Sequence, residues 1–146
     1  MSASPSVFTL EAANSLVPRL NALMGLQMGR RAAIEDRLAK LAKLVGSVPD
    51  AIELDDADPP DVRELKTELL ARIEEYQGSW RELEETGAVL KDARTGLVDF
   101  YGQVDGRFVW LCWRYGEESV THYHALDEGF SGRKPIGAVT RQRHMN

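Results

Sequence analysis

The chain has few of the features that mark secreted or membrane-spanning proteins. It holds a single cysteine, Cys112, which cannot form an internal disulfide and lies in an apolar run where a small buried side chain is expected. That run, Phe108 to Trp113, is the longest unbroken apolar stretch and has six residues, whereas a membrane-spanning helix needs about 20. The N-terminus lacks the basic and apolar regions of a signal peptide. These absences predict a cytoplasmic protein without a membrane partner.

An excess of basic residues is also missing. The formal net charge is −5, and residues 50–61 contain six acidic side chains and no Lys or Arg. Outside that segment the net charge is +1, and Lys and Arg are interleaved with Glu. No basic face is therefore expected that could neutralise a series of phosphates. The sequence predicts no nucleic-acid partner.

The segment 9–46 has apolar residues at the three- and four-residue steps of an amphipathic helix. Thr9 is the expected N-cap, and Gly46 is the expected C-terminal stop. Pro18 would remove a helical hydrogen bond and clash with the preceding turn. We therefore expect a short helix ending near Leu16 and a long helix starting near Pro18.

The segment 61–86 predicts a second long helix, because its apolar residues follow a heptad-like pattern typical of a coiled coil. These residues are Val62, Leu65, Leu69, Ile73, Tyr76, Trp80 and Leu83. Residues 47–60 contain adjacent prolines and a run of carboxylates, so we expect an exposed, poorly ordered acidic loop. The two helices would lie antiparallel across this loop.

The segment 88–125 predicts an antiparallel sheet. Asp105-Gly106 lies between two apolar strands and is a strong signal for a hairpin with a type I′ turn. The turn fixes the register, which places an apolar set of side chains on one face. On the opposite face, the register places Asp99 opposite Cys112.

The predicted fold class is α+β, with a long antiparallel helical hairpin followed by a small three- or four-stranded antiparallel sheet. A third strand is expected at about residues 120–125 and a short edge strand at 88–91. We expect a single domain over residues 1–137. Residues 138–146 have little to bury and are predicted to be a disordered tail.

Four sequence blocks identify a family. They read FTLEAANSLVPRL near the N-terminus, then GAVLKDARTGLVDF, VWLCWRYGE and HYHALDEGFSGRKPI in the last third of the chain. With these blocks the chain resembles the small prokaryotic family catalogued as domain of unknown function 2203. The resemblance covers nearly the whole chain and implies a single compact unit. It brings no activity, substrate or cofactor with it, so no functional residue is carried over.

Two histidines suggest a metal site. His122 and His124 are two residues apart on the predicted third strand, so both imidazoles would lie on one face. Asp99 or Cys112 could complete a site for zinc if a three-residue connection follows Tyr115 and sets the register. The alternative is that both histidines are partly buried strand residues hydrogen-bonded to carboxylates.

A polar pocket on the same sheet face is a second hypothesis, in which arginine binds an anion and a carboxylate or histidine acts as acid or base. The simpler alternative is a cross-strand ion pair between Asp99 and Arg114, with Arg133 capping a turn. Because no nucleophile and base stand out as a pair, no catalytic residue is assigned and a non-enzyme is favoured. The candidate ligand-binding residues are Asp99, Arg114, His122, His124, Asp127 and Arg133.

The leading functional hypothesis is a cytoplasmic interaction or assembly protein that forms a homodimer through its long helices, or that binds another protein there. The reason is that both helices are too apolar along one stripe to stand alone. The alternative is a small metal- or anionic-ligand-binding protein, or an enzyme, that uses the polar face of the sheet. This alternative predicts that His124→Ala leaves the fold intact but abolishes binding.

Overall fold

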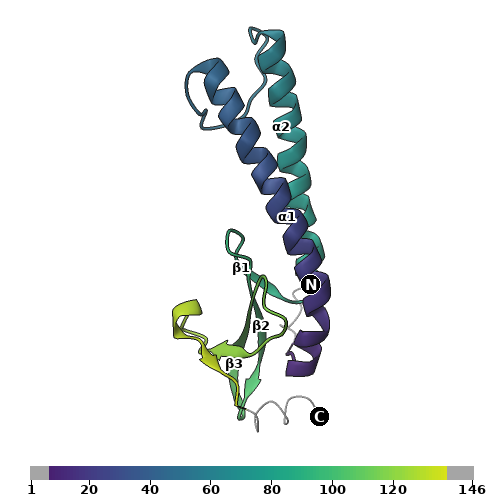
Figure 1. Ribbon diagram of the computed structural model, residues 1–146, viewed down its shortest axis with the longest axis vertical. Coiled ribbons are helices and arrows are strands. Elements are labelled where there is room, and N and C mark those ends of the chain that lie inside the picture. The colour runs from purple at the N-terminus through teal and green to yellow at the C-terminus, as the bar shows by residue number, and fades with distance from the viewer. Residues whose placement is uncertain (1–6, 138–146) are drawn as a thin grey trace, which may run out of the picture. The chain divides into compact units, whose positions relative to one another are not determined.

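The computed structural model describes residues 7–137, which form an α+β protein (Figure 1). Its helices are α1 (Leu10–Val45), α2 (Pro60–Ser79) and the short α3 (Arg81–Glu84). A five-stranded antiparallel sheet and one turn of 3-10 helix follow α3 in the chain. The predicted fold class is therefore confirmed at the level of helices and an antiparallel sheet.

The chain separates into two compact units. One contains the chain up to Met24 together with the chain from Arg81 onward, and the other is Gly25–Trp80. The predicted tail, 138–146, lies outside the described residues. None of the helices in the described range is long and apolar enough to cross a membrane.

The first helix, α1, continues through Pro18, so the predicted break was wrong. Thr9 is the N-cap as expected, and its Oγ1 accepts a hydrogen bond from the N–H of Ala12 at 3.0 Å. Pro18 costs the helix one hydrogen bond and a steric clash with the preceding turn. Buried side chains recur at helical spacing on both sides of it, and their burial holds the helix together. They are Leu10, Ala13, Val17, Leu20 and Met24.

The predicted second helix is divided into α2 and α3, so a single helix over 61–86 was also wrong. The division follows Gly78 and Ser79, which have weak helix propensity. The Ser79 hydroxyl donates to the carbonyl of Glu75 at 2.7 Å, a contact that often bends helices. Gly87, with a φ of 88°, follows α3 and ends the helical region.

The unit Gly25–Trp80 buries apolar side chains of α1 and α2 against each other. Leu41, Val62 and Leu69 form its buried cluster, and Ile34, Leu38, Ile52 and Leu65 pack on it. In the acidic loop, the Asp58 carboxylate binds Lys66 Nζ at 3.0 Å and accepts the Asp55 N–H at 2.9 Å. The apolar side chains of α1 and α2 in this unit therefore have partners within the chain, and the acidic loop has a defined turn.

The sheet has five strands in chain order, where three or four were predicted. They are β1 (Val89–Asp92), β2 (Leu97–Val104), β3 (Arg107–Arg114), β4 (His122–His124) and β5 (Lys134–Pro135). The missed strand, β5, has two residues and one of them is proline, so it carries no periodic signal. It is held by pairing with β4, and the N–H of Ile136 donates to the Thr121 carbonyl at 2.8 Å.

The predicted β2–β3 register is confirmed from the turn onward. Val104 lies opposite Arg107, and Asp105 and Gly106 have the positive φ angles, 52° and 78°, that a type I′ turn requires. The apolar face of these strands is buried, and the N-terminal end of α1 lies alongside the sheet (Figure 1). The Asn14 side chain links the two by accepting the Val120 N–H at 2.6 Å. The opposite, polar face is thereby left for the candidate site.

Candidate functional site

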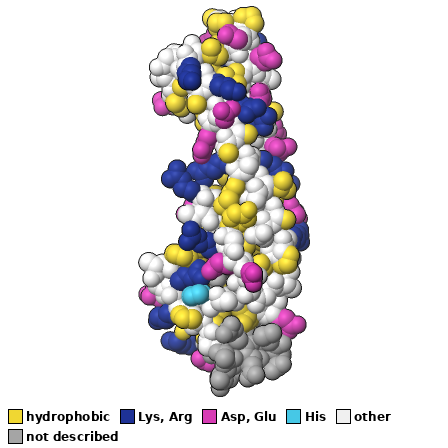
Figure 2. Space-filling view, viewed as in Figure 1, with side chains coloured by type: hydrophobic (Ala, Val, Ile, Leu, Met, Phe, Trp, Pro, Cys, Tyr) yellow, Lys and Arg dark blue, Asp and Glu magenta, His cyan; other side chains and the backbone are white. Residues whose placement is uncertain are grey.

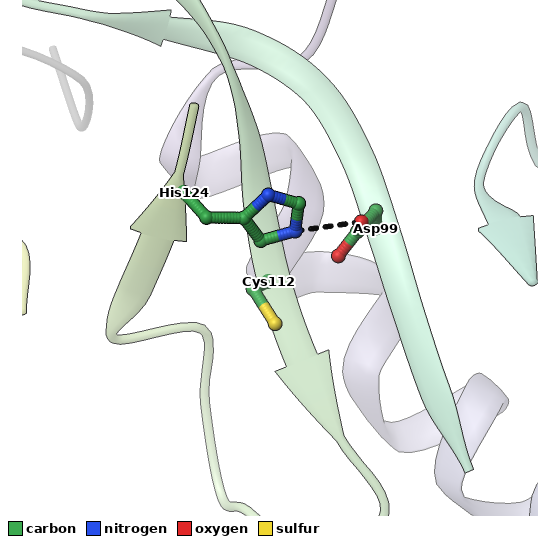
Figure 3. A group of neighbouring side chains, drawn as sticks. All are labelled: Asp99, Cys112 and His124. Carbon is green, nitrogen blue, oxygen red and sulfur yellow. Dashed lines mark hydrogen bonds and ion pairs between the residues drawn. The ribbon is translucent and has the colours of Figure 1, made fainter. Parts of the chain in front are cut away.

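Three adjacent strands bring Asp99, Cys112 and His124 together on the polar face of the sheet (Figure 3). β4 pairs with β3 so that His122 lies opposite Cys112 and His124 opposite Trp110. Directly opposite residues share a face, so this is the register that the metal hypothesis required. The exposed fractions of Asp99, Cys112 and His124 are only 1%, 0% and 2%.

The imidazole of His124 holds the carboxylate of Asp99. His124 Nε2 lies 2.8 Å from Asp99 Oδ2, and His124 Nδ1 lies 3.0 Å from the Ala125 carbonyl oxygen. A carbonyl only accepts hydrogen bonds, so Nδ1 carries a hydrogen. A second hydrogen lies between Nε2 and Oδ2 and forms the hydrogen bond that joins them. Whichever of these two atoms holds it, the pair of imidazole and carboxyl group has no net charge. The other carboxylate oxygen, Asp99 Oδ1, has no hydrogen-bond partner within the described chain.

Burial dominates the acid–base properties of this group. It raises the pKa of the Asp99 carboxyl, and the neighbouring His124 opposes the rise. Burial, followed by the charge of Asp99, raises the pKa of the Cys112 thiol to about 12. The thiol is therefore protonated at neutral pH and is a poor nucleophile unless a cation is bound.

His122 has a different environment. Its Nδ1 accepts a hydrogen bond from Arg133 Nη2 at 2.8 Å, and Thr121 Oγ1 lies at the same distance. Burial and then the charge of Arg133 lower the pKa of His122. Arg133 also forms an ion pair with Glu117, with Nη2 2.6 Å from Oε2. His122 is therefore neutral at neutral pH and belongs to the Arg133 network.

A cavity of about 340 Å³ adjoins Asp99 and His124. Its apolar wall comes from Leu97, Trp110, Leu126 and Phe130, and its charged side chains besides Asp99 are Lys91 and Glu128. A second pocket of about 200 Å³ shares Leu97 and Phe130 with it and is also lined by Asp92 and Arg114. The two pockets are therefore neighbours on the polar face.

Two cations beside these pockets interact with aromatic rings. Lys91 Nζ lies 4.3 Å from the centroid of the Trp110 ring, and the Arg114 guanidinium carbon lies 5.7 Å from that of Phe130. Within the described part of the chain, neither cation forms an ion pair. Figure 2 shows Lys and Arg side chains together with acidic ones on the surface over the sheet. The pockets thus hold two positive groups that form no close ion pair with a described residue, although Asp92, Asp99 and Glu128 also line them.

Comparison with protein-family models assigns the chain to a family. Residues 6–136 match the model of an uncharacterized conserved protein, DUF2203. The chain belongs to the DUF2203 family. The resemblance seen in the sequence is thereby confirmed, and the match includes every residue of the candidate site. No curated protein and no solved structure matches the chain.

The candidate residues of this DUF2203 protein fall into three groups. Asp99 and His124 lie together at the cavity, and Arg114 lines the neighbouring pocket. The alternative ion pair between Asp99 and Arg114 is not formed, because His124 takes the Asp99 carboxylate. His122 and Arg133 contact each other, whereas Asp127 is exposed and lines neither pocket.

Sequence reasoning missed Lys91, Trp110, Glu128 and Phe130 as cavity residues. Trp110 could have been found, because it lies two residues before Cys112 on the same predicted strand and therefore on the same face. Lys91 could not, because the β1–β2 register shifts between Leu90 and Asp92. A bulge of this kind redirects a side chain without changing the apolar pattern.

Proposed function

We propose that the protein binds a small organic anion in the cavity on the polar face of its sheet. The observation that carries this proposal is the pair of cations, Lys91 and Arg114, which lie at neighbouring pockets and form no ion pair with a described residue. A ligand's carboxylate or phosphate would supply the missing negative partner. The aromatic walls formed by Trp110 and Phe130 suit an apolar or aromatic ligand body.

The buried pair of Asp99 and His124 adds a second requirement for the ligand. Because the pair has no net charge, it does not repel an anion. Asp99 Oδ1 lacks a hydrogen-bond donor, and leaving a buried polar atom unsatisfied costs about 1–3 kcal/mol. A ligand with a hydroxyl or amino group could donate to this oxygen. The best-fitting class is therefore a small anion that also carries a hydrogen-bond donor.

Replacing Lys91 tests the proposal. Lys91→Gln keeps a polar side chain, one bond shorter, but removes the charge and with it the cation–π contact with Trp110. We expect the dissociation constant for the preferred anion to rise about 10- to 100-fold, the effect of losing one charged hydrogen bond. Calorimetry would measure it on a panel of carboxylates and phosphate esters, with and without an aromatic ring and a hydroxyl.

Lys43→Gln is the matched control, because Lys43 is exposed on α1, far along the chain from the cavity residues. This variant should bind the anion as the parent protein does. Equal weakening by both replacements would mean that only the overall charge matters, and no binding by the parent across the panel would contradict the proposal.

A second proposed function is assembly through the helices, as a homodimer with coiled-coil packing of an antiparallel helical hairpin. It is favoured by exposed leucines of the Gly25–Trp80 unit, namely Leu26, Leu44 and Leu70 at 59%, 49% and 38% exposure. Leu26 and Leu44 are five helical turns apart and so lie on the same side of α1. Leu69 and Leu83 are already buried within the chain, so an interface would use the exposed leucines instead.

Molar mass in solution tests the homodimer. Size-exclusion chromatography with light scattering at two concentrations should give twice the chain mass of 16.3 kDa. Leu26→Gln with Leu44→Gln should shift the protein to the monomer mass without unfolding it, whereas Ala32→Gln on the same helix should not. A monomer at both concentrations for the parent chain would contradict this proposal.

In both proposals the protein acts in the cytoplasm of a prokaryotic cell, where a free thiol stays reduced.

A further inference from the structure

We propose that Asp99, Cys112 and His124 hold one divalent cation of the zinc class. The three side chains come from adjacent strands, β2, β3 and β4, and each offers one ligand atom (Figure 3). These atoms lie within 4.8 Å of one another. One ion bound at about 2.0–2.3 Å from each atom would bridge them. A thiolate with an imidazole favours zinc and related ions over magnesium or calcium.

The ring of His124 already has the orientation of a metal ligand. Its Nδ1–H donates to the Ala125 carbonyl at 3.0 Å, which leaves Nε2 facing Asp99 and available to a cation. Metal-bound histidines almost always donate their other N–H to a carbonyl or carboxylate, which fixes the ring and its tautomer. His122 has no such arrangement, because its Nδ1 accepts from the positively charged Arg133.

The unsatisfied oxygen of Asp99 is an independent indication. Asp99 is 1% exposed, and its Oδ1 has no hydrogen-bond donor in the described chain. Buried carboxylate oxygens normally have a partner, because an unsatisfied one is costly. A cation between Asp99, Cys112 and His124 would give this carboxylate the partner that it lacks.

The exchange of protons for the ion balances in charge. Without a cation, the Asp99–His124 pair holds one shared proton and Cys112 holds its thiol proton, so the group is neutral. A divalent cation displaces both protons to solvent and binds a carboxylate, a thiolate and a neutral imidazole. The group is then neutral again, so the buried site carries no net charge in either state.

The nearby arginine does not oppose this site. Arg133 Nη1 lies 4.0 Å from Cys112 Sγ, where its charge favours the thiolate that a metal ion needs. Its own charge is balanced by Glu117, with Nη2 2.6 Å from Oε2. The Arg133–Glu117 pair is therefore neutral as a whole and adds little repulsion toward a cation.

Three protein ligands leave one position of a tetrahedral ion open, as in catalytic zinc sites. Asp99 and His124 also line the 340 Å³ cavity, so a ligand in the cavity can reach this position. The cation site itself stands on its three ligand atoms. Only the further step, in which the organic anion takes the open position, rests on the proposed function.

Titration with cobalt(II) chloride alone tests the cation site on the full chain, because a thiolate ligand gives cobalt a charge-transfer absorption band. We expect one cobalt ion per chain, this band at saturation, and displacement of cobalt by one equivalent of zinc. Cys112→Ser should abolish the band. Asp99→Asn keeps a side-chain oxygen that can accept a hydrogen bond from His124 Nε2 but removes the negative charge, and should weaken binding by more than about 100-fold, beyond the loss of an outer-shell partner.

His122→Gln is the matched control and should bind cobalt with the parent's stoichiometry and band. No band in the parent, a band that survives Cys112→Ser, or one ion for two chains would overturn the site. The anion panel, repeated with saturating zinc and with a chelator, is a separate measurement. Cobalt binding without anion binding would support the cation site and contradict the proposed function. Anion binding without cobalt binding would support the proposed function and overturn the cation site.

Discussion

His124→Ala lowers the free energy of unfolding by about 3–5 kcal/mol, the expected cost of removing one partner from a buried pair. The replacement leaves the Asp99 carboxylate, 1% exposed, without the 2.8 Å hydrogen bond between its Oδ2 and His124 Nε2. It also removes the N–H that satisfies the Ala125 carbonyl. From the sequence, this variant was expected to keep its fold and lose only binding. Because His124 is 2% exposed, we now expect it to lose stability as well.

Urea unfolding at neutral pH, in the presence of a chelator, measures this effect. His122→Ala is the control and should cost about 1 kcal/mol, the value of one hydrogen bond. The double variant Asp99→Leu with His124→Leu should recover most of the lost stability, because no buried carboxylate remains without its partner and only the hydrogen bond to the Ala125 carbonyl stays lost. A cost below about 1 kcal/mol for His124→Ala would show that Asp99 finds water or another partner, contrary to this account.

In the folded protein, Cys112 reacts with iodoacetamide about 1000-fold more slowly than in the unfolded chain at pH 8, because only the thiolate reacts. Folding raises the thiol pKa from the model value of 9.0 to about 12, chiefly through burial. In the folded state the rate should increase about tenfold per pH unit until the pH approaches this pKa, whereas in the unfolded chain it should level off above pH 9.

The same pKa shift makes the stability of the fold depend on pH. Between pH 9 and pH 12 the folded chain keeps a proton that the unfolded chain has lost, so stability falls as the pH rises through this range. Because the chain has one cysteine, alkylation reports on this site alone. Asp99→Asn should raise the native rate, since the charge of Asp99 is the second cause of the shift. Equal rates in the folded and unfolded chains would contradict the burial argument.

The hairpin at the centre of the sheet could be predicted because two independent signals agree there. Asp105-Gly106 supplies a turn with positive φ angles, and the alternation of the flanking strands allows only one register. The same register placed Asp99 opposite Cys112, so two of the three proposed cation ligands followed from local sequence. The N-cap Thr9 could be predicted for the same reason, because its partner, Ala12, is three residues away.

The parts that could not be predicted depend on contacts between distant segments. The helix continues through Pro18 because the side chains around it are buried, which a local propensity does not include. The bond between Asp99 and His124 joins residues on strands that are not sequence neighbours, and Lys91 reaches the cavity from an irregular edge strand. The last two features need the pairing of β1 or β4 with the central hairpin, which no short-range signal specifies.

The division of the chain into two units has a consequence for how this protein can be altered. Residues 25–80 are, in chain order, an insertion into the unit that carries the site, because that unit is built from the chain before Gly25 and after Trp80. Every residue of the cavity and of the cation site follows this insertion in the sequence. The Gly25–Trp80 unit can therefore be shortened, lengthened or tagged in its acidic loop without replacing any residue of the site.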